Sequence, residues 1–95
     1  MIYIDRLLWE TPEEINKNLA KRIKNLRKRK GISQKEISEH TGVSYGSIKR
    51  FESSGNISLL SLTKIAMELD CSDQIKDLFT GVTYKSIQEV LNESK

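Results

Sequence analysis

Signals that start and stop helices recur along this 95-residue chain and divide it into short segments, leaving little room for a sheet. Thr11 with Glu14 and Ser33 with Glu36 form capping boxes, in which each side chain accepts a hydrogen bond from a backbone N–H group at the helix start. Further capping residues are Ser44, Ser58 and Ser72, and the residues expected to end helices are Gly31, Gly42 and Gly81. The chain is therefore predicted to be all-α, with five short helices.

Apolar residues recur every three or four positions in these segments, as on one face of a helix. The first helix is expected over about 12–30, and its inward residues are Ile15, Leu19, Ile23 and Leu26. Those of the next four helices are Ile37, Ile48, Phe51, Leu59, Leu62, Ile65, Ala66, Leu69, Ile75, Leu78 and Phe79. The fifth helix is expected to run from Ser72 towards Gly81, and the spacing of Tyr84, Ile87, Val90 and Leu91 favours a short sixth helix.

Three parts of the chain differ in composition. Residues 1–10 form an apolar N-terminal arm, residues 11–80 carry the capped helices, and residues 81–95 form a C-terminal tail. The arm contains Ile2, Tyr3, Ile4, Leu7, Leu8 and Trp9, and only its first four residues resemble a strand. A segment this apolar must pack on its own subunit or on a partner, so a homodimer contact and packing within the chain both remain open.

The charge is concentrated in one stretch. The formal net charge is +3, but residues 16–50 contain eleven basic and two acidic side chains, while the segments on either side each carry −3. A concentrated basic segment fits a surface that binds a polyanion, and it also fits a solvated helix face.

Several classes of protein are disfavoured. Cys71 is the only cysteine, so an intrachain disulfide is impossible, which fits a reducing compartment. The chain has no apolar run of about 20 residues and no signal-peptide pattern at its start, so a cytoplasmic location is expected. His40 is the only histidine, and it lacks the partners of a zinc site or a catalytic pair. We therefore expect no enzyme activity, metal or cofactor.

The most informative stretch is residues 32–55, ISQKEISEHTGVSYGSIKRFESSG. A two-turn helix, a tight turn containing Gly42 and a second short helix make a helix-turn-helix. Ser38 is small where the two helices cross, and glycine adopts the left-handed conformation that such a turn requires. The residues expected to form one shared apolar seam are Ile37, Val43, Ile48 and Phe51. An ordinary helical hairpin explains this seam equally well, but it does not explain the basic residues on the same segment.

The residues from Leu26 to Gly55 resemble the helix-turn-helix of phage repressors, Cro proteins and their bacterial relatives, the lambda-repressor-like or XRE-type family. The shared pattern comprises Ser-Gln-x-Glu-Ile, Gly-Val-Ser, Ser-Ile and Phe-Glu, and the resemblance continues to Phe79. It implies a five-helix repressor-like domain that binds double-stranded DNA sequence-specifically. It also implies a transcriptional regulator of the repressor kind, acting as a homodimer and reading the major groove with helix 44–53.

The resemblance also implies individual roles. Gln34 matches a position that contacts a phosphate and braces the recognition helix. The positions facing base edges or nearby phosphates are Tyr45, Gly46, Ser47 and Arg50, and those contacting the DNA backbone are Ser44 and Lys49. Gly46 departs from the family, because many relatives have a long polar side chain there. Either it permits close approach of the helix backbone to DNA, or the position reads nothing.

Three charged residues of the helices are assigned separately. Lys28, in the basic run at the end of the first helix, is expected to meet a DNA phosphate, although cations also stabilise the negative end of a helix. Arg27 matches a family position that pairs with the glutamate matched here by Glu52. The resemblance thus implies a structural ion pair between the first and third helices.

The tail suggests an alternative function. Residues 78–91 are similar to the tails of family members that act as antitoxins beside kinase-like toxins of the HipA type. This short resemblance implies an interaction module that neutralises a toxin and autoregulates its operon. A single chain can perform both tasks.

Overall fold

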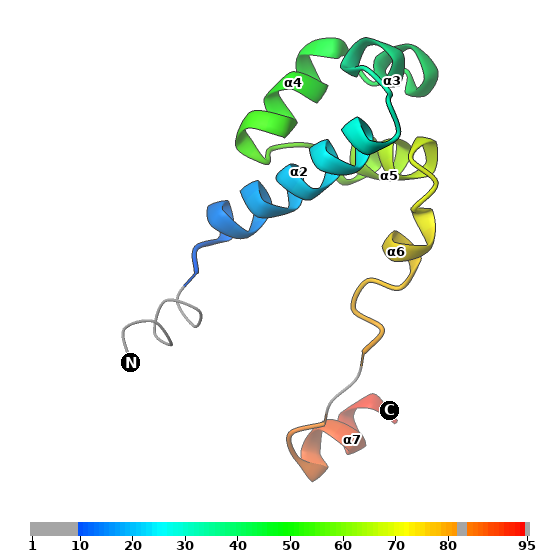
Figure 1. The fold of residues 1–95 in the computed structure, drawn as a ribbon. Coiled ribbons are helices and arrows are strands. Elements are labelled where there is room, and N and C mark those ends of the chain that lie inside the picture. Colours follow the sequence, from blue (N-terminus) through cyan, green and yellow to red (C-terminus); the bar gives the residue numbers. More distant parts are fainter. Residues whose placement is uncertain (1–9, 82–83, 95) are drawn as a thin grey trace.

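The computed structural model describes residues 10–81 and 84–94, and every regular element in these ranges is a helix (Figure 1). The helices are α2 (Pro12–Arg29), α3 (Gln34–Thr41), α4 (Tyr45–Ser54), α5 (Leu59–Glu68), α6 (Ser72–Lys76) and α7 (Ile87–Glu93). The all-α prediction is confirmed, including the short sixth helix. The expectations about the apolar arm at 1–9 lie outside the described residues.

Local capping explains where the first helices begin. Thr11 Oγ1 accepts a hydrogen bond from the Glu14 N–H at 3.1 Å, and Ser33 Oγ accepts one from the Glu36 N–H at 3.0 Å. Both glutamates return a bond to the backbone N–H of the capping residue, which completes both capping boxes. Two otherwise unpaired N–H groups are satisfied at each start, so these helix starts follow from the sequence.

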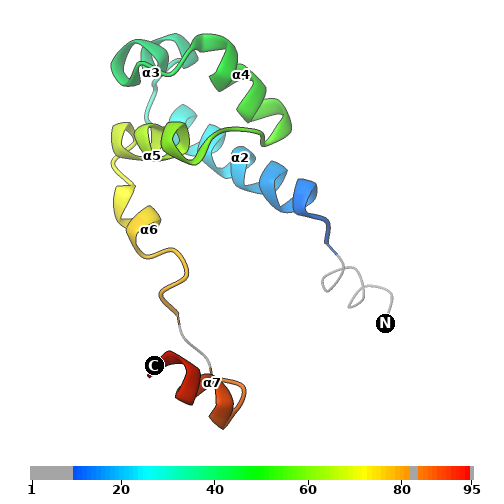
Figure 2. The ribbon, with the colours of Figure 1, turned by 180° about the vertical axis from the view of Figure 1, so that it is seen from behind.

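The core lies between α2 and the three helices that follow it. The helix α4 packs along α2, and α3 contacts both α4 and α5 (Figures 1 and 2). The buried apolar side chains are Ala20, Ile37, Val43, Ile48, Phe51, Ile65, Ala66 and Leu69. Each large one stabilises the fold by about 1.5–3 kcal/mol relative to an exposed position. The seam of the helix-turn-helix is thus part of the single core.

Gly55 allows the chain to pass directly over α2. It follows α4 with a φ of 86°, in the left-handed region, and it is buried. A Cβ atom at this position would lie 2.7 Å from the carbonyl carbon of Asn16 and 2.8 Å from the Lys17 nitrogen. The absence of a side chain therefore sets how closely α4 and its following loop approach the first helix.

The fifth helix differs from the prediction. Ser72 is already the first residue of α6, Cys71 holds the N-cap position without a side-chain bond, and the helix ends at Lys76. The start follows from the end of α5, where Asp70 has a φ of 63° and the Cys71 N–H donates to the Ala66 carbonyl at 2.8 Å. This tight reversal leads directly into the next helix and removes the need for a serine cap.

Four residues expected in the core are exposed instead. They are Ile15, Leu59, Leu78 and Phe79. The first two lie in the opening turns of α2 and α5, and the start of α2 extends beyond the other helices (Figure 1). The last two follow the early end of α6. The helix α7 contacts no other described helix, so its apolar residues are exposed as well.

Candidate nucleic-acid interface

A tight turn joins α3 to α4. Gly42 ends α3 with a φ of 80°, and its N–H donates to the Ser38 carbonyl at 2.9 Å. The Ser38 hydroxyl reaches across the turn and donates to the Val43 carbonyl at 2.7 Å. This bond holds the turn while the Val43 side chain enters the core. The angle between the two helices is thereby fixed from both sides of Gly42.

The helix α4 has one buried and one exposed face. Ile48 and Phe51 are almost completely buried against the core. The exposed residues are Tyr45, Gly46, Lys49, Arg50 and Ser53. Ser44 caps the helix, since its Oγ accepts from the Ser47 N–H at 3.1 Å and donates to the Ser47 hydroxyl at 2.8 Å. The start of α4 therefore presents a polar surface on a rigid support.

Two cations flank Gly46 on this exposed face. The Lys49 Nζ lies 4.9 Å from the centroid of the Tyr45 ring, which is a cation–π contact one helical turn apart. Arg50 follows Tyr45 by five residues, or about 140° around the helix. It therefore lies on the other edge of the face, with Gly46 between Arg50 and the Tyr45–Lys49 pair.

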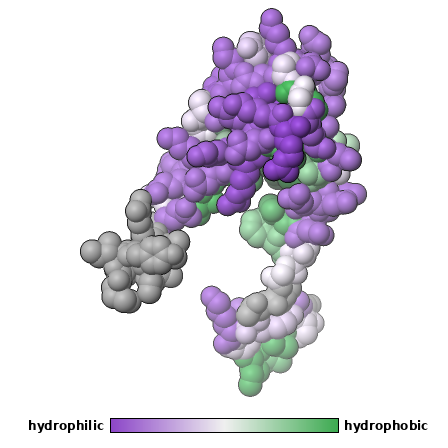
Figure 3. All heavy atoms as spheres, in the orientation of Figure 1, coloured by the Kyte–Doolittle hydropathy of each residue, from purple (hydrophilic) through white to green (hydrophobic). Residues whose placement is uncertain are grey.

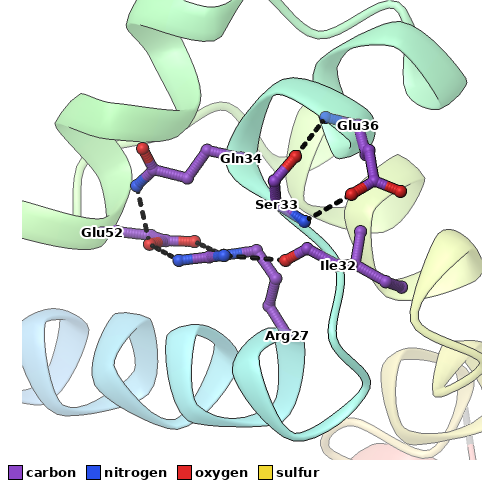
Figure 4. A network of polar contacts seen from close by, with 6 residues as sticks. All are labelled: Arg27, Ile32, Ser33, Gln34, Glu36 and Glu52. Carbon is purple, nitrogen blue, oxygen red and sulfur yellow. Dashed lines mark hydrogen bonds and ion pairs between the residues drawn. The ribbon is translucent and has the colours of Figure 1, made fainter.

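A buried polar network joins α2, α3 and α4 (Figure 4). The Arg27 guanidinium meets the Glu52 carboxylate at two points, with Nε 2.7 Å from Oε2 and Nη2 3.0 Å from Oε1. Only 9% of the Arg27 side chain and 4% of the Glu52 side chain are exposed. Arg27 also donates to the Ile32 carbonyl at 2.8 Å, and the Ile32 N–H donates to the Arg27 carbonyl at 3.2 Å. This geometry clamps α4 and the α2–α3 loop to the first helix.

Gln34 completes the network from the first turn of α3. Its side-chain Nε2 donates to Glu52 Oε1 at 2.9 Å, while its carbonyl oxygen points away from the carboxylate (Figure 4). No buried side-chain nitrogen or oxygen of the described residues lacks a partner. A fully satisfied network of this kind favours one arrangement of the helices, because breaking one of its bonds leaves a buried polar group without that partner.

Basic side chains extend the polar surface onto α2. Lys17, Lys21 and Lys24 line a shallow groove together with Glu52 and Ser53 of α4. Hydrophilic residues cover most of the surface over α2 and α4 in Figure 3. From the sequence, these lysines were counted only within the basic stretch 16–50 and were not assigned to the site. Their spacing of four and three residues, which puts them on one helix face, was the available signal.

The fold and this surface agree with a known family. A protein-family model described as helix-turn-helix matches residues 23–76, more than half of the chain. The chain belongs to the XRE-type, lambda-repressor-like helix-turn-helix family. It is a sequence-specific DNA-binding regulator of transcription, and its family is not one of enzymes. A search among curated proteins found no match.

In this helix-turn-helix protein, the residues assigned to DNA fall into two groups. Most lie at the N-cap or on the helix α4, namely Ser44, Tyr45, Gly46, Ser47, Lys49 and Arg50, while Gln34 begins α3 and meets α4 at Glu52. Lys28 is separate from them, exposed in the last turn of α2. The helix bounds are Tyr45–Ser54 rather than 44–53, because Ser44 is the cap.

We also searched residues 10–81 and 84–94 for a metal site and for a membrane-spanning helix. These residues contain no group of three or more His, Cys, Asp or Glu side chains able to hold a metal. No helix within these ranges is long and apolar enough to cross a membrane. His40 lies 3.2 Å from Glu68 and links α3 to α5 at the surface. Cys71 packs against the core, where burial raises the pKa of its thiol.

Proposed function

We propose that this protein is a cytoplasmic transcriptional repressor, that residues 11–80 are its DNA-binding unit, and that α4 enters the major groove. The observation that carries the proposal is the exposed polar face of α4, held on α2 by the Arg27–Glu52–Gln34 network. A helix that reads bases must be presented outward and at a defined angle, because base contacts require matched hydrogen-bond geometry.

The exposed residues divide by the kind of contact that each supports. Arg50 is the candidate for a bidentate bond to guanine, the commonest specific contact in the major groove. Tyr45, Gly46 and Ser47 are assigned to base edges or nearby phosphates. Ser44, Lys49, Lys28 and Gln34 are assigned to the DNA backbone. Gln34 retains a second amide hydrogen beside its bond to Glu52, so it can donate to a phosphate while bracing α4.

The first experiment selects bound sites from random duplex DNA and then measures affinity at two salt concentrations. Affinity should fall steeply as salt rises, because each lysine or arginine on a phosphate displaces a counterion. Absence of binding at low salt, or indifference to salt, would contradict DNA binding.

A pair of variants then separates base reading from charge. Arg50→Ala should weaken the selected duplex by roughly 5- to 150-fold and flatten the preference at one base pair, since a good bidentate contact contributes about 1–3 kcal/mol. Lys28→Ala is the matched control, because it also removes one cation but should weaken selected and scrambled duplexes equally. If the two variants exchange these effects, the assigned orientation of α4 is wrong.

We further propose that the protein acts as a homodimer and represses transcription. Two copies would place two α4 helices on half-sites about 10 base pairs apart. The exposed apolar residues after α6 offer a surface for association. Light scattering on the purified protein measures the oligomeric state, and a reporter gene carrying the selected site should lose expression when the protein is present. A strict monomer on a single half-site, or an increase in expression, would contradict this part of the proposal.

The second candidate is an antitoxin that binds a kinase-like toxin of the HipA type. The observation favouring it is the apolar C-terminal segment, where Phe79 is 94% exposed and Ile87 is 78% exposed. Soluble monomers rarely leave neighbouring large apolar side chains uncovered. Co-expression with a kinase-like protein encoded beside it should yield a stable complex and relieve growth arrest. A tail-truncated chain that binds such a toxin equally well would contradict the role given to this segment.

A further inference from the structure

Gly46 is the only glycine of α4, and the folded structure gives no reason for a glycine at this position. It lies in the first turn of α4, on the exposed side, and its φ is that of an ordinary helix. A Cβ atom added there would meet no atom within 4 Å. Gly42 and Gly55, by contrast, have positive φ values of 80° and 86°. Because glycine destabilises a helix relative to alanine, the reason for Gly46 lies outside the folded chain.

The neighbouring side chains leave the space over Gly46 open. Lys49 lies towards the ring of Tyr45, with its Nζ 4.9 Å from the ring centroid. The hydroxyl of Ser47 bonds back to Ser44 at 2.8 Å. The position over the Gly46 backbone is therefore open on the exposed face, and we call this open position the notch.

At Gly46 itself the notch offers no side chain, only the helix backbone and the two Cα hydrogens. Among the groups that base pairs present in the major groove, the C5-methyl of thymine is the apolar group that projects from the base edge. A polar base edge placed over Gly46 would find no side chain of that residue to bond, whereas a methyl group can contact the Cα hydrogens directly.

We propose that Gly46 is a specificity-determining position that seats the C5-methyl group of one thymine against the backbone of α4. The proposal rests on the proposed function, in which α4 enters the major groove. Arg50 lies four residues further on, about 6 Å along the helix axis. Since base pairs are spaced by about 3.4 Å, the thymine lies within about two base pairs of the base that Arg50 reads.

The test uses the Gly46→Ala variant, which adds one methyl group to the notch. The variant should melt at a higher temperature than the wild type, since alanine suits the helix better. Its affinity for the selected duplex should fall about tenfold or more, while its affinity for scrambled DNA is unchanged. Deoxyuridine, which lacks only the C5-methyl, is then substituted for each thymine of the site in turn.

At one position, and only there, deoxyuridine should restore the affinity of the Gly46→Ala variant to that of the wild type on the same duplex. The substitutions at all other thymines are the internal control. Three results would overturn the proposal: a lower melting temperature for the variant, equal affinity of both proteins for the selected duplex, or a loss that no substitution restores. Failure of the wild type to select any duplex would instead reject DNA binding itself, so the two failures are distinguishable.

Discussion

Replacing Gly55 by alanine tests how the recognition helix is seated on α2. The change has two effects on the folded state. A residue with a Cβ pays about 1–2 kcal/mol in the left-handed conformation that Gly55 adopts. The new Cβ would also lie 2.7 Å from the Asn16 carbonyl carbon and 2.8 Å from the Lys17 nitrogen, both backbone atoms of α2. These atoms cannot rotate away, so the helix itself must move.

Overpacking of this kind typically costs about 1–3 kcal/mol, which brings the total for Gly55→Ala to about 2–5 kcal/mol. A domain of this size has a free energy of unfolding of about 5–10 kcal/mol, so the variant should lose a large share of its stability. Gly42→Ala is the matched control, because its φ of 80° is equally left-handed but its Cβ would meet nothing within 4 Å. That control should lose only the conformational part, about 1–2 kcal/mol.

Thermal melts and urea unfolding of the two variants, measured side by side, give the difference. We expect Gly55→Ala to melt at least about 4 °C below Gly42→Ala, because 1 kcal/mol shifts the melting temperature of such a domain by about 4–8 °C. Equal losses in the two variants would refute the close approach of the α4–α5 loop to α2, and with it the seating of α4 described above.

Two further predictions concern side chains near the recognition helix. Glu52→Ala should lower the free energy of unfolding by about 3 kcal/mol, because it leaves the buried Arg27 unpaired. Glu68→Ala removes an exposed pair with His40 and should cost under about 1 kcal/mol. Urea titrations compare the two variants, and equal losses would contradict the burial of the network. The backbone N–H and hydroxyl of Ser33 hold the pKa of Glu36 below its ordinary value. The ionised carboxylate therefore stabilises the fold at pH values above the ordinary pKa, and this contribution is lost as the pH falls through the lowered pKa. Glu36→Gln should show a smaller fall in melting temperature in acid than the wild type, and parallel pH profiles would show that the capping carboxylate has no such role.

Much of the interface was predictable because its causes are local. A capping box involves residues three positions apart, so the starts of α2 and α3 follow from Thr11 and Ser33. The left-handed turn at Gly42 depends on a single residue type. The helical period also separates the buried Ile48 from its exposed neighbours on α4. The family resemblance rested on the same local pattern.

The early end of α6 was not predictable from residue types. The sequence around Ser72 offers a serine cap and inward apolar residues, but the reversal at Asp70 starts the helix one residue earlier than that cap requires. Aspartate in the left-handed conformation is uncommon, and here two backbone bonds that close the end of α5 stabilise it. Leu78 and Phe79 follow the end of α6 at Lys76, and both are exposed.

What the sequence alone determined about this protein is its set of helices and the exposed face of α4, because hydrogen bonds and periodicity over three or four residues decide both. The tertiary structure decided what those helices meet. It placed Gly55 on the backbone of α2, Lys21 beside Ser53, and the hydroxyl of Ser38 on the Val43 carbonyl. Apart from the Ser38 bond, these contacts join residues far apart in the chain. They depend on how whole helices pack, and local propensity carries no information about that packing.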